Sequence, residues 1–164
     1  MLDEKALRHV VDELAIRNLV CLYPLSLDRR RFEGLREMFS QAIEADFTRA
    51  GRREVYRGPA EGWIADIAGM VRAMDATQHQ LGNLRVELDG DTARASCSFL
   101  AMHVLHNDTG SSRYDVIGFY DFALAREPAG WRVRKYAATK DRGFGNPHIF
   151  RIAAARAQGG GAQP

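Results

Sequence analysis

Two stretches in the second half of the chain alternate apolar and polar residues on both sides of a short turn sequence. In residues 81–105 the turn is Asp89-Gly90-Asp91, and in residues 111–139 it is the segment REPAG. Such alternation predicts strands with one buried face, and a short Gly-containing turn between two strands predicts a β-hairpin. The two hairpins together predict about four antiparallel strands.

The first half of the chain has the periodicity of helices. In residues 3–28 apolar residues recur at spacings of three and four, which predicts a long helix that Pro24 bends or ends. Residues 28–40 and 58–74 predict two more helices, and residues 42–50 predict a short strand between them. Helices segregated from antiparallel strands predict an α+β fold, in which a curved antiparallel sheet packs against three N-terminal helices and encloses one pocket.

Size and charge exclude several classes of protein. The chain has 164 residues and a formal net charge of +2, which gives no reason to expect nucleic acid or an anionic membrane as a partner. We assign residues 1–150 to a single domain and residues 151–164, which end in Gly and polar residues, to a mobile tail. The charged start resembles no signal peptide and no apolar run reaches a membrane span, so we expect a cytoplasmic protein.

Two polar residues are candidates for acid–base chemistry. His79, in the segment TQHQLGN, is a candidate base because imidazole has the side-chain pKa nearest neutrality. A single histidine before a strand is nevertheless more often a surface residue or a hydrogen-bonded buried one. Asp28 has an ordinary role as the N-cap of the second predicted helix. A carboxylate can cap a helix and also hold an imidazole, so both roles stay open.

Four segments, in their order along the chain, resemble the SnoaL-like family of the nuclear-transport-factor-2-like superfamily. They are IRNLVCLYPLSLDRRRFEGLREMF, YRGPAEGWI, TQHQLGNLRVELDGDTARASCSFLAMHV and YDFALAREPAGWRVRKYA. The resemblance covers most of residues 10–140 and implies an α+β cone, in which helices close one side of a curved sheet around a deep pocket. Within the family the chain looks most like the dehydratase and lyase subgroup, which includes scytalone dehydratase, bile-acid 7α-dehydratase and hexachlorocyclohexane dehydrochlorinase.

That subgroup pairs an aspartate at the end of the first long helix with a histidine before the first hairpin. The matching residues are Asp28 and His79, so the resemblance implies His79 as the base and Asp28 as the group that orients it and stabilises its cation. It also implies Tyr23 and His103 as pocket groups that assist a departing oxygen. Scytalone dehydratase has a tyrosine directly before its aspartate, where this chain has Leu27, so we do not expect scytalone itself as the substrate.

Further residues are candidates for the pocket wall. Alternation along the strand leaves open whether His103 faces the pocket or the outside, and it allows only one of Tyr120 and Asp121 to point inward. The side chains expected to bind substrate are Phe47, Trp63, Met38, Phe119, Tyr120 and Arg142. Core packing is the alternative for the apolar ones, and solvent exposure is the alternative for Arg142 and for Lys140.

These observations predict a lyase of the dehydratase type, acting on a hydrophobic cyclic molecule such as a steroid, a polyketide or an aromatic. An isomerase or polyketide-type cyclase with the same site, or a ligand-binding module without turnover, are the alternatives. The histidines and cysteines have no metal-binding spacing and no Gly-rich phosphate loop is present, so we expect no metal and no organic cofactor. We expect a homo-oligomer, a dimer or trimer, formed through the outer face of the sheet.

Overall fold

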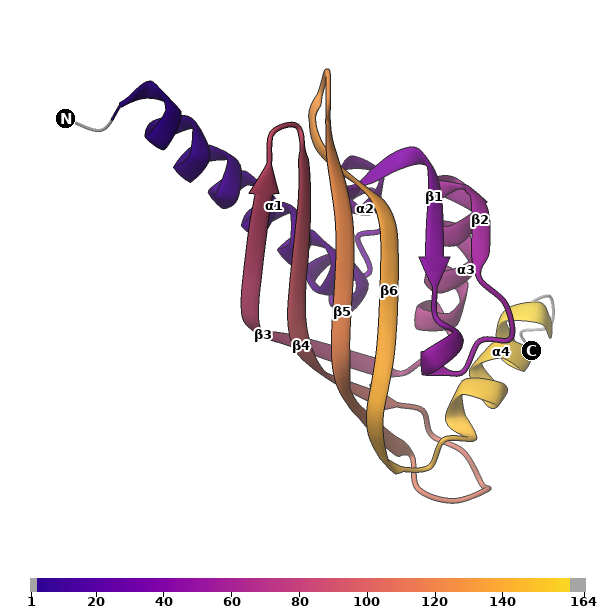
Figure 1. The fold of residues 1–164 in the computed structure, drawn as a ribbon. Helices are drawn as coiled ribbons and strands as arrows, with labels where there is room; N and C mark the ends of the chain where they lie inside the picture. The colour runs from indigo at the N-terminus through magenta and orange to yellow at the C-terminus, as the bar shows by residue number, and fades with distance from the viewer. Residues whose placement is uncertain (1–2, 160–164) are drawn as a thin grey trace.

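The computed structural model describes residues 3–159, which form a curved, unclosed six-stranded sheet with helices packed against it (Figure 1). The strands are β1 (Phe39–Asp46), β2 (Tyr56–Pro59), β3 (Ala76–Asp89), β4 (Thr92–Val104), β5 (Arg113–Glu127) and β6 (Gly130–Gly145). Their order across the sheet is β2-β1-β6-β5-β4-β3. The predicted α+β class is confirmed, but the sheet is mixed, because β1 and β6 pair in parallel. A parallel pair needs a long crossover, and the chain between β1 and β6 supplies it.

The two predicted hairpins are confirmed, and they form the long central part of the sheet. In the first hairpin Asp89 pairs with Thr92, and Gly90 has a φ of 59°. A two-residue hairpin turn requires this left-handed backbone conformation, which glycine adopts without strain. In the second hairpin Glu127 pairs with Gly130.

The helices differ from the sequence-based expectation at both ends of the chain. They are α1 (Glu4–Asp28), α2 (Gly34–Met38), α3 (Ala60–Arg72) and α4 (Ile149–Gly159), with a short 3₁₀ turn, η1 (Thr48–Ala50). Pro24 does not end α1, because it is buried together with Tyr23 and packing offsets the lost backbone hydrogen bond. The sequence pattern predicted Asp28 as the N-cap of the second helix, but in the structure Asp28 is the last residue of α1. Helix α2 is also much shorter than predicted.

Helix α4, strand β2 and the 3₁₀ turn η1, whose residues were expected to continue the strand of 42–50, were not predicted from the sequence. Residues 151–159, which we assigned to a tail, lie in α4, where Ile149 and Ala153 are fully buried. An alanine-rich run has high helix propensity, and its apolar face packs against α3. The remaining part of the expected tail, residues 160–164, lies outside the described residues. Strand β2 has only four residues, two of them Gly58 and Pro59, and so lacks a strand pattern.

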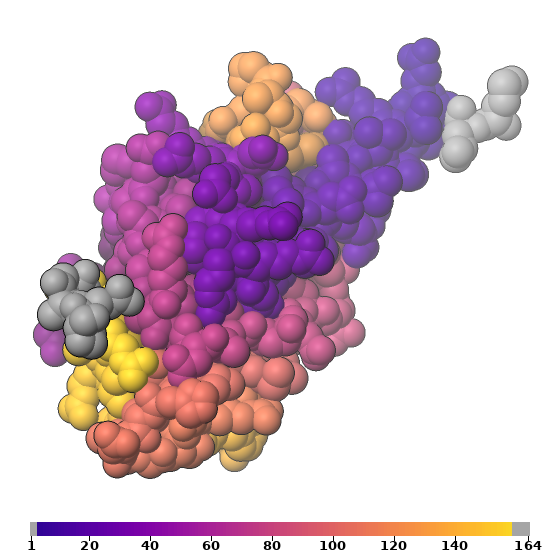
Figure 2. All heavy atoms as spheres, turned by 180° about the vertical axis from the view of Figure 1, so that it is seen from behind, coloured from indigo at the N-terminus to yellow at the C-terminus, as the bar shows by residue number. Residues whose placement is uncertain are grey.

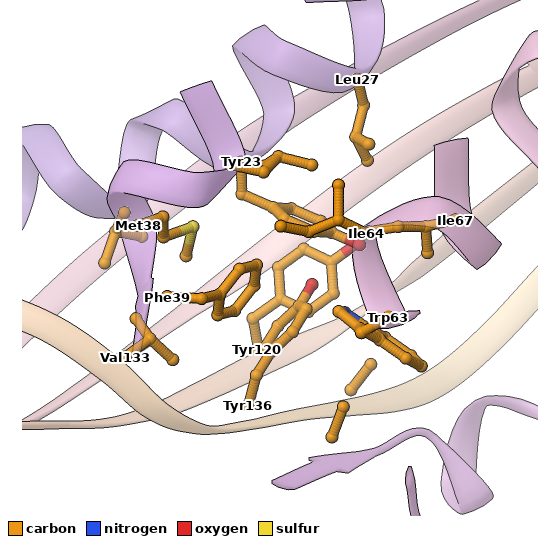
Figure 3. Close-up of a cluster of buried hydrophobic side chains, with 14 of the residues drawn as sticks. Tyr23, Leu27, Met38, Phe39, Trp63, Ile64, Ile67, Tyr120, Val133 and Tyr136 are labelled. Atoms are coloured by element: carbon orange, nitrogen blue, oxygen red, sulfur yellow. The ribbon is translucent and has the colours of Figure 1, made fainter. Parts of the chain in front are cut away.

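The helices hold the core against one face of the sheet. Helix α1 lies along β3, and α3 packs against β1, β2 and α4. Figure 2, seen from behind, shows these helices as a continuous surface from which the N-terminal part of α1 projects. Figure 3 shows core side chains from α1, α3 and the sheet meeting at Tyr23, Trp63, Tyr120 and Tyr136.

Candidate functional site

A cavity of about 710 Å³ lies between the inner face of the sheet and helices α3 and α4. The apolar part of its wall includes Leu27, Phe47, Ile67, Met70, Val71, Phe99, Ala101, Val116, Ala138, Phe150, Ala154 and Ala157. The polar side chains of the wall are Tyr23, Arg52, Asp66, His79, His103, Tyr114, Tyr120, Lys140 and Gln158. A mainly apolar wall with a few polar groups suits a small apolar molecule that carries one or two oxygens.

The structure brings Asp28 and His79 into direct contact at this cavity. His79 Nδ1 lies 2.7 Å from Asp28 Oδ1, and the backbone N–H of His79 donates to Asp28 Oδ2 at 2.7 Å. The side chain of His79 is only 5% exposed, and that of Asp28 is 13% exposed. A carboxylate only accepts hydrogen bonds, so in the neutral ring Nδ1 carries the proton and Nε2 keeps a free lone pair. His79 lines the cavity and Asp28 lies behind it.

Two further donors hold the Asp28 carboxylate. The Thr77 hydroxyl donates to Oδ1 at 3.0 Å, and Gln78 Nε2 donates to Oδ2 at 3.3 Å. Burial acts to raise the pKa of Asp28, but the hydrogen bonds from the ring and backbone of His79 and from Thr77 outweigh it and lower the pKa below its ordinary value. Asp28 is therefore a fixed negative charge beside the imidazole.

Arg30 ties this group of residues to the end of α1. Its backbone φ of 57° lies in the left-handed region, which turns the chain directly after the helix. The guanidinium donates to Leu27 O at 3.2 Å, to Met74 O at 3.2 Å and to Thr77 Oγ1 at 3.1 Å. Because the Thr77 oxygen accepts from Arg30, its proton is directed at Asp28.

His103 lies on the inner face of β4, which settles the alternative that the sequence left open. Phe99, Ala101 and His103 are all buried and line the cavity. The rings of His103 and His79 meet edge to face with centroids 5.5 Å apart. His103 Nδ1 lies 3.2 Å from the Tyr114 carbonyl oxygen, so Nδ1 is the protonated nitrogen. Burial, with a smaller effect of His79, lowers the pKa of His103 to about 4, and its ring is neutral at pH 7.

Three tyrosines, Tyr23, Tyr120 and Tyr136, meet in the core (Figure 3), and two of them, Tyr23 and Tyr120, also line the cavity. The ring of Tyr23 lies edge-on to those of Tyr120 and Tyr136, with centroids 5.8 Å and 4.9 Å away. Burial raises the pKa of Tyr23 to about 12, and it raises the pKa values of Tyr120 and Tyr136 well above the ordinary value. All three phenols therefore stay protonated, and Tyr23 and Tyr120 reach the cavity as hydrogen-bond donors.

The structure places four of the six expected wall residues elsewhere. Met38 and Trp63 are fully buried in the core and do not line the cavity. Phe119 is 53% exposed and lies on the outer face, because it alternates with the inward Tyr120. Arg142 is exposed and does not line the cavity.

The other two expected wall residues, Phe47 and Tyr120, do line the cavity. Of the pair that alternation could not separate, Asp121 is exposed and Tyr120 points inward. Lys140, two residues before Arg142, is the basic residue that reaches the cavity.

Sequence reasoning missed the residues that support the histidines. Thr77 precedes His79 by two positions, so period-two alternation places both side chains on one face of β3. This alternation was the signal in the sequence that could have identified Thr77 as a neighbour of the pair. Tyr114 contributes through its carbonyl group, which any residue could supply, so its identity carried no signal. Phe150 lies over His103 from α4, with ring centroids 4.7 Å apart, and α4 itself was not predicted.

Comparison with known proteins gives the family. A model of the SnoaL-like domain matches residues 8–137. The chain belongs to the SnoaL-like family. An uncharacterized protein of Mycobacterium tuberculosis, Rv2910c, is 28% identical over 131 residues, which span 80% of this chain and 86% of that protein.

Solved structures of the same fold include enzymes. The crystal structure of Kfla4162 from Kribbella flavida has a TM-score of 0.82 and 25% identity, with 87% of this chain and 99% of that chain covered. Hexachlorocyclohexane dehydrochlorinase LinA-type3 from Novosphingobium barchaimii has a TM-score of 0.72 and 20% identity, with 86% and 94% covered. The α+β cone inferred from the resemblance is thereby confirmed as a fold, and the fold hosts lyases among other proteins.

Residues 3–159 contain neither a candidate metal-binding cluster nor a helix able to cross a membrane. No group of three or more His, Cys, Asp or Glu side chains there is arranged to hold a metal ion. No helix in this range combines the length and the apolar character that crossing a membrane requires.

Proposed function

We propose that the protein is a lyase in which His79 removes a proton from carbon and Asp28 orients and stabilises it. The observation that carries this proposal is the Asp28–His79 contact, with Asp28 behind the ring and the ring at the wall of an apolar cavity. A base in such a setting takes a proton without competition from bulk water. The nearby carboxylate stabilises the imidazolium that forms.

The reaction that fits these groups is elimination of water next to a carbonyl. His79 Nε2 takes the proton from the carbon beside the carbonyl, and the C–H electron pair passes into an enolate. The enolate re-forms the carbonyl and expels the β-hydroxyl group, which takes the proton back from the imidazolium and leaves as water. The products are an unsaturated carbonyl compound and water, and the chain supplies every proton transfer without a cofactor.

The phenols and the second histidine have distinct roles in this scheme. Tyr23 and Tyr120 donate hydrogen bonds to the carbonyl oxygen, where negative charge develops. His103 presents its unprotonated Nε2, since Nδ1 donates to the Tyr114 carbonyl. It therefore accepts the hydrogen bond of the departing hydroxyl group and orients it.

Isomerisation is the second candidate function, and the two protonated phenols favour it. Donors to a carbonyl oxygen stabilise an enolate, and an enolate can be protonated at another carbon instead of losing water. Incorporation of deuterium from D₂O into the recovered substrate reports formation of the enolate in both cases. Release of water, measured by mass spectrometry as the loss of one water from the substrate, separates elimination from isomerisation, which leaves the mass unchanged.

The test is a screen of β-hydroxy carbonyl compounds with steroid, polyketide or aromatic rings. The expected result is elimination by the wild-type protein, loss of turnover in His79→Ala and a drop of about 10²-fold in Tyr23→Phe. Ligand binding to His79→Ala should persist, because the apolar wall is intact. Equal turnover by wild type and His79→Ala would remove the proposed base, and binding with no turnover in the wild type would favour a ligand-binding module.

A further inference from the structure

Helix α1 ends in a backbone motif that usually contains glycine. The N–H of Arg31 donates to Ser26 O at 2.9 Å, and the N–H of Arg30 donates to Leu27 O at 3.1 Å. This pair of hydrogen bonds defines the Schellman motif, whose left-handed residue is most often glycine. Arg30 occupies that position, with a φ of 57°. Because a side chain strains the backbone in this region, the contacts of the arginine must compensate for the strain.

The Arg30 guanidinium bridges three segments that meet beside the proposed catalytic pair. From Nη1 it donates to Leu27 O at 3.2 Å, in the last turn of α1, and from Nη2 it donates to Met74 O at 3.2 Å, just before β3. A third hydrogen bond runs from Nη1 to Thr77 Oγ1 at 3.1 Å, on β3 itself. Arginine holds its donors in a rigid plane, so the two carbonyl contacts fix the direction of the third hydrogen bond.

The Thr77 hydroxyl connects this guanidinium to Asp28. Its oxygen accepts from Arg30, so its proton is left to donate to Asp28 Oδ1, 3.0 Å away. The same Oδ1 lies 2.7 Å from His79 Nδ1. A continuous chain of hydrogen bonds therefore leads from Arg30 through Thr77 and Asp28 to the ring of His79. Arg30 itself lies outside the wall of the cavity, so it acts on the site through other residues.

Two neighbouring arginines show what distinguishes Arg30. Arg29 and Arg31 carry the same charge, and both are exposed. Within residues 3–159, the side-chain hydrogen bonds of this run of three arginines all come from Arg30. A positive charge near the end of α1 is thus supplied by all three residues, whereas the connection to Thr77 is supplied by Arg30.

We propose that Arg30 is a positioning residue, which holds the Thr77 hydroxyl in the orientation that donates to Asp28. A carboxylate fixed in this way keeps Oδ1 against the His79 ring, and the ring presents Nε2 to the cavity. This role rests on the proposed function of His79 as a base, although the contacts themselves need no substrate. Loss of Arg30 should slow the chemical step and leave substrate binding, which the cavity wall provides, unchanged.

The variant Arg30→Asn tests this role. Asparagine tolerates the left-handed conformation, so the end of α1 should persist, but its side chain is too short to reach Thr77. We expect kcat to fall about tenfold, as for one hydrogen bond at a charged group, with KM unchanged. Arg31→Asn, the same change at the exposed neighbour, is the matched control and should keep the wild-type kcat. A wild-type kcat in Arg30→Asn, or equal losses in both variants, would overturn the proposal.

The variant Arg30→Gly separates positioning from backbone strain. Glycine adopts a φ near 57° without strain, so circular dichroism should show a folded protein. It supplies no donor to Thr77, and its kcat should therefore fall as far as that of Arg30→Asn. If glycine instead restores the wild-type kcat, the loss in Arg30→Asn comes from the backbone and the proposal fails.

A double variant tests the route through Thr77. If Arg30 acts through the hydroxyl, Arg30→Asn combined with Thr77→Val should be little slower than Thr77→Val alone, because residues that act as a unit are not additive. A kcat loss equal to the product of the two single losses would mean that Arg30 acts by another route and would contradict the proposal.

The carboxyl group of Asp28 gives a measurement that needs no substrate. A directed donor lowers the pKa of a carboxyl, so a ¹³C NMR titration should show a higher pKa for Asp28 in Arg30→Asn than in the wild type. Arg31→Asn removes the same charge and should leave this pKa unchanged. An unchanged pKa in Arg30→Asn would overturn the positioning role even if His79 is the base. A raised pKa together with a wild type that turns over no substrate would support the positioning of Asp28 and refute only the proposed function.

Discussion

Residues 3–159 contain two Asp–His pairs that share the same kinds of contact but differ in their surroundings. In the buried pair, Asp28 accepts from the backbone N–H of His79 and lies against its Nδ1, at 2.7 Å in both contacts. In the second pair, the backbone N–H and Nδ1 of His106 both contact a single oxygen of Asp75, Oδ2, at 2.6 Å each. The side chain of His79 is 5% exposed and that of His106 is 82% exposed.

The difference shows that a carboxylate beside an imidazole does not by itself make a catalytic site. The pKa values of both aspartates are lowered, for Asp75 chiefly by the hydrogen bond from the His106 backbone and for Asp28 against the opposing effect of burial. Water around His106 screens the pair and competes for protons. Of His79 and His106, it is His79 that lines a cavity able to hold a substrate.

The largest expected effect separates the two histidines. His79→Ala should lower kcat/KM by about 10²–10⁴-fold, the usual contribution of a general base. His106→Ala should leave kcat/KM unchanged, because this ring lies outside the cavity. Steady-state kinetics on a substrate from the screen measure both variants. A comparable loss in both would mean that they act through stability rather than through chemistry.

The next effect separates the two aspartates. Asp28→Asn should lower kcat by about 10²–10³-fold, since an amide no longer stabilises the imidazolium and can hold the wrong tautomer. Asp75→Asn should have no effect on kcat. The double variant of Asp28→Asn with His79→Ala should be little slower than His79→Ala alone, because residues that act as a unit are not additive. If the loss of kcat in the double variant equals the product of the losses in the two single variants, Asp28 acts independently of His79.

A smaller effect concerns acid stability near the buried pair. The pKa of His103 is about 4, below its ordinary 6.5, so the unfolded chain binds this proton first as pH falls. The folded state therefore loses stability as pH falls from about 6.5 to about 4, by about 3 kcal/mol over this range. Between pH 6.5 and pH 4 the His103→Gln variant should therefore lose about 3 kcal/mol less stability than the wild-type protein. Urea unfolding at a series of pH values measures the difference, and parallel curves would contradict it.

The smallest effect concerns Thr77, whose hydroxyl donates a hydrogen bond to Asp28 of the buried pair. The exposed pair of Asp75 and His106 has no equivalent of this residue. Thr77→Val removes one donor to Asp28 while keeping the shape of the side chain. The pKa of Asp28 should rise, and kcat should fall about tenfold, as expected for one hydrogen bond to a charged group. Thr77→Ser, which keeps the hydroxyl, should restore kcat. If serine and valine behave alike, the hydroxyl has no positioning role.

The sequence predicted the parts of the fold that local patterns specify. The turn at Gly90 and the alternation on both sides of it were sufficient for the first hairpin and for placing Phe99 and His103 on one face. The resemblance identified Asp28 and His79, and the structure brings them into contact. The local pattern alone predicted an N-cap for Asp28, because Asp before a helical pattern is the common N-cap signal, whereas the resemblance placed Asp28 at the end of the first long helix, where the structure has it.

The errors lie where tertiary contacts decide the outcome. Phe119 and Tyr120 are adjacent and both aromatic, so composition cannot say which faces the cavity, whereas the register of β5 does. Trp63 was expected in the wall, but Phe47 packs over it with ring centroids 4.9 Å apart and separates it from the cavity. Arg30 and Thr77 hold Asp28 through contacts across nearly fifty positions, which no local pattern encodes.

The protonation state of the His79 ring tests the account most directly, and it needs no substrate. A long-range ¹H–¹⁵N correlation spectrum, recorded as the pH is raised until the ring is neutral, distinguishes the two nitrogens. The account predicts that His79 keeps its proton on Nδ1, hydrogen-bonded to Asp28, with Nε2 unprotonated, and that Asp28→Asn loses this preference. A neutral His79 with its proton on Nε2 in the wild-type protein would leave no base facing the cavity and would contradict the proposed mechanism.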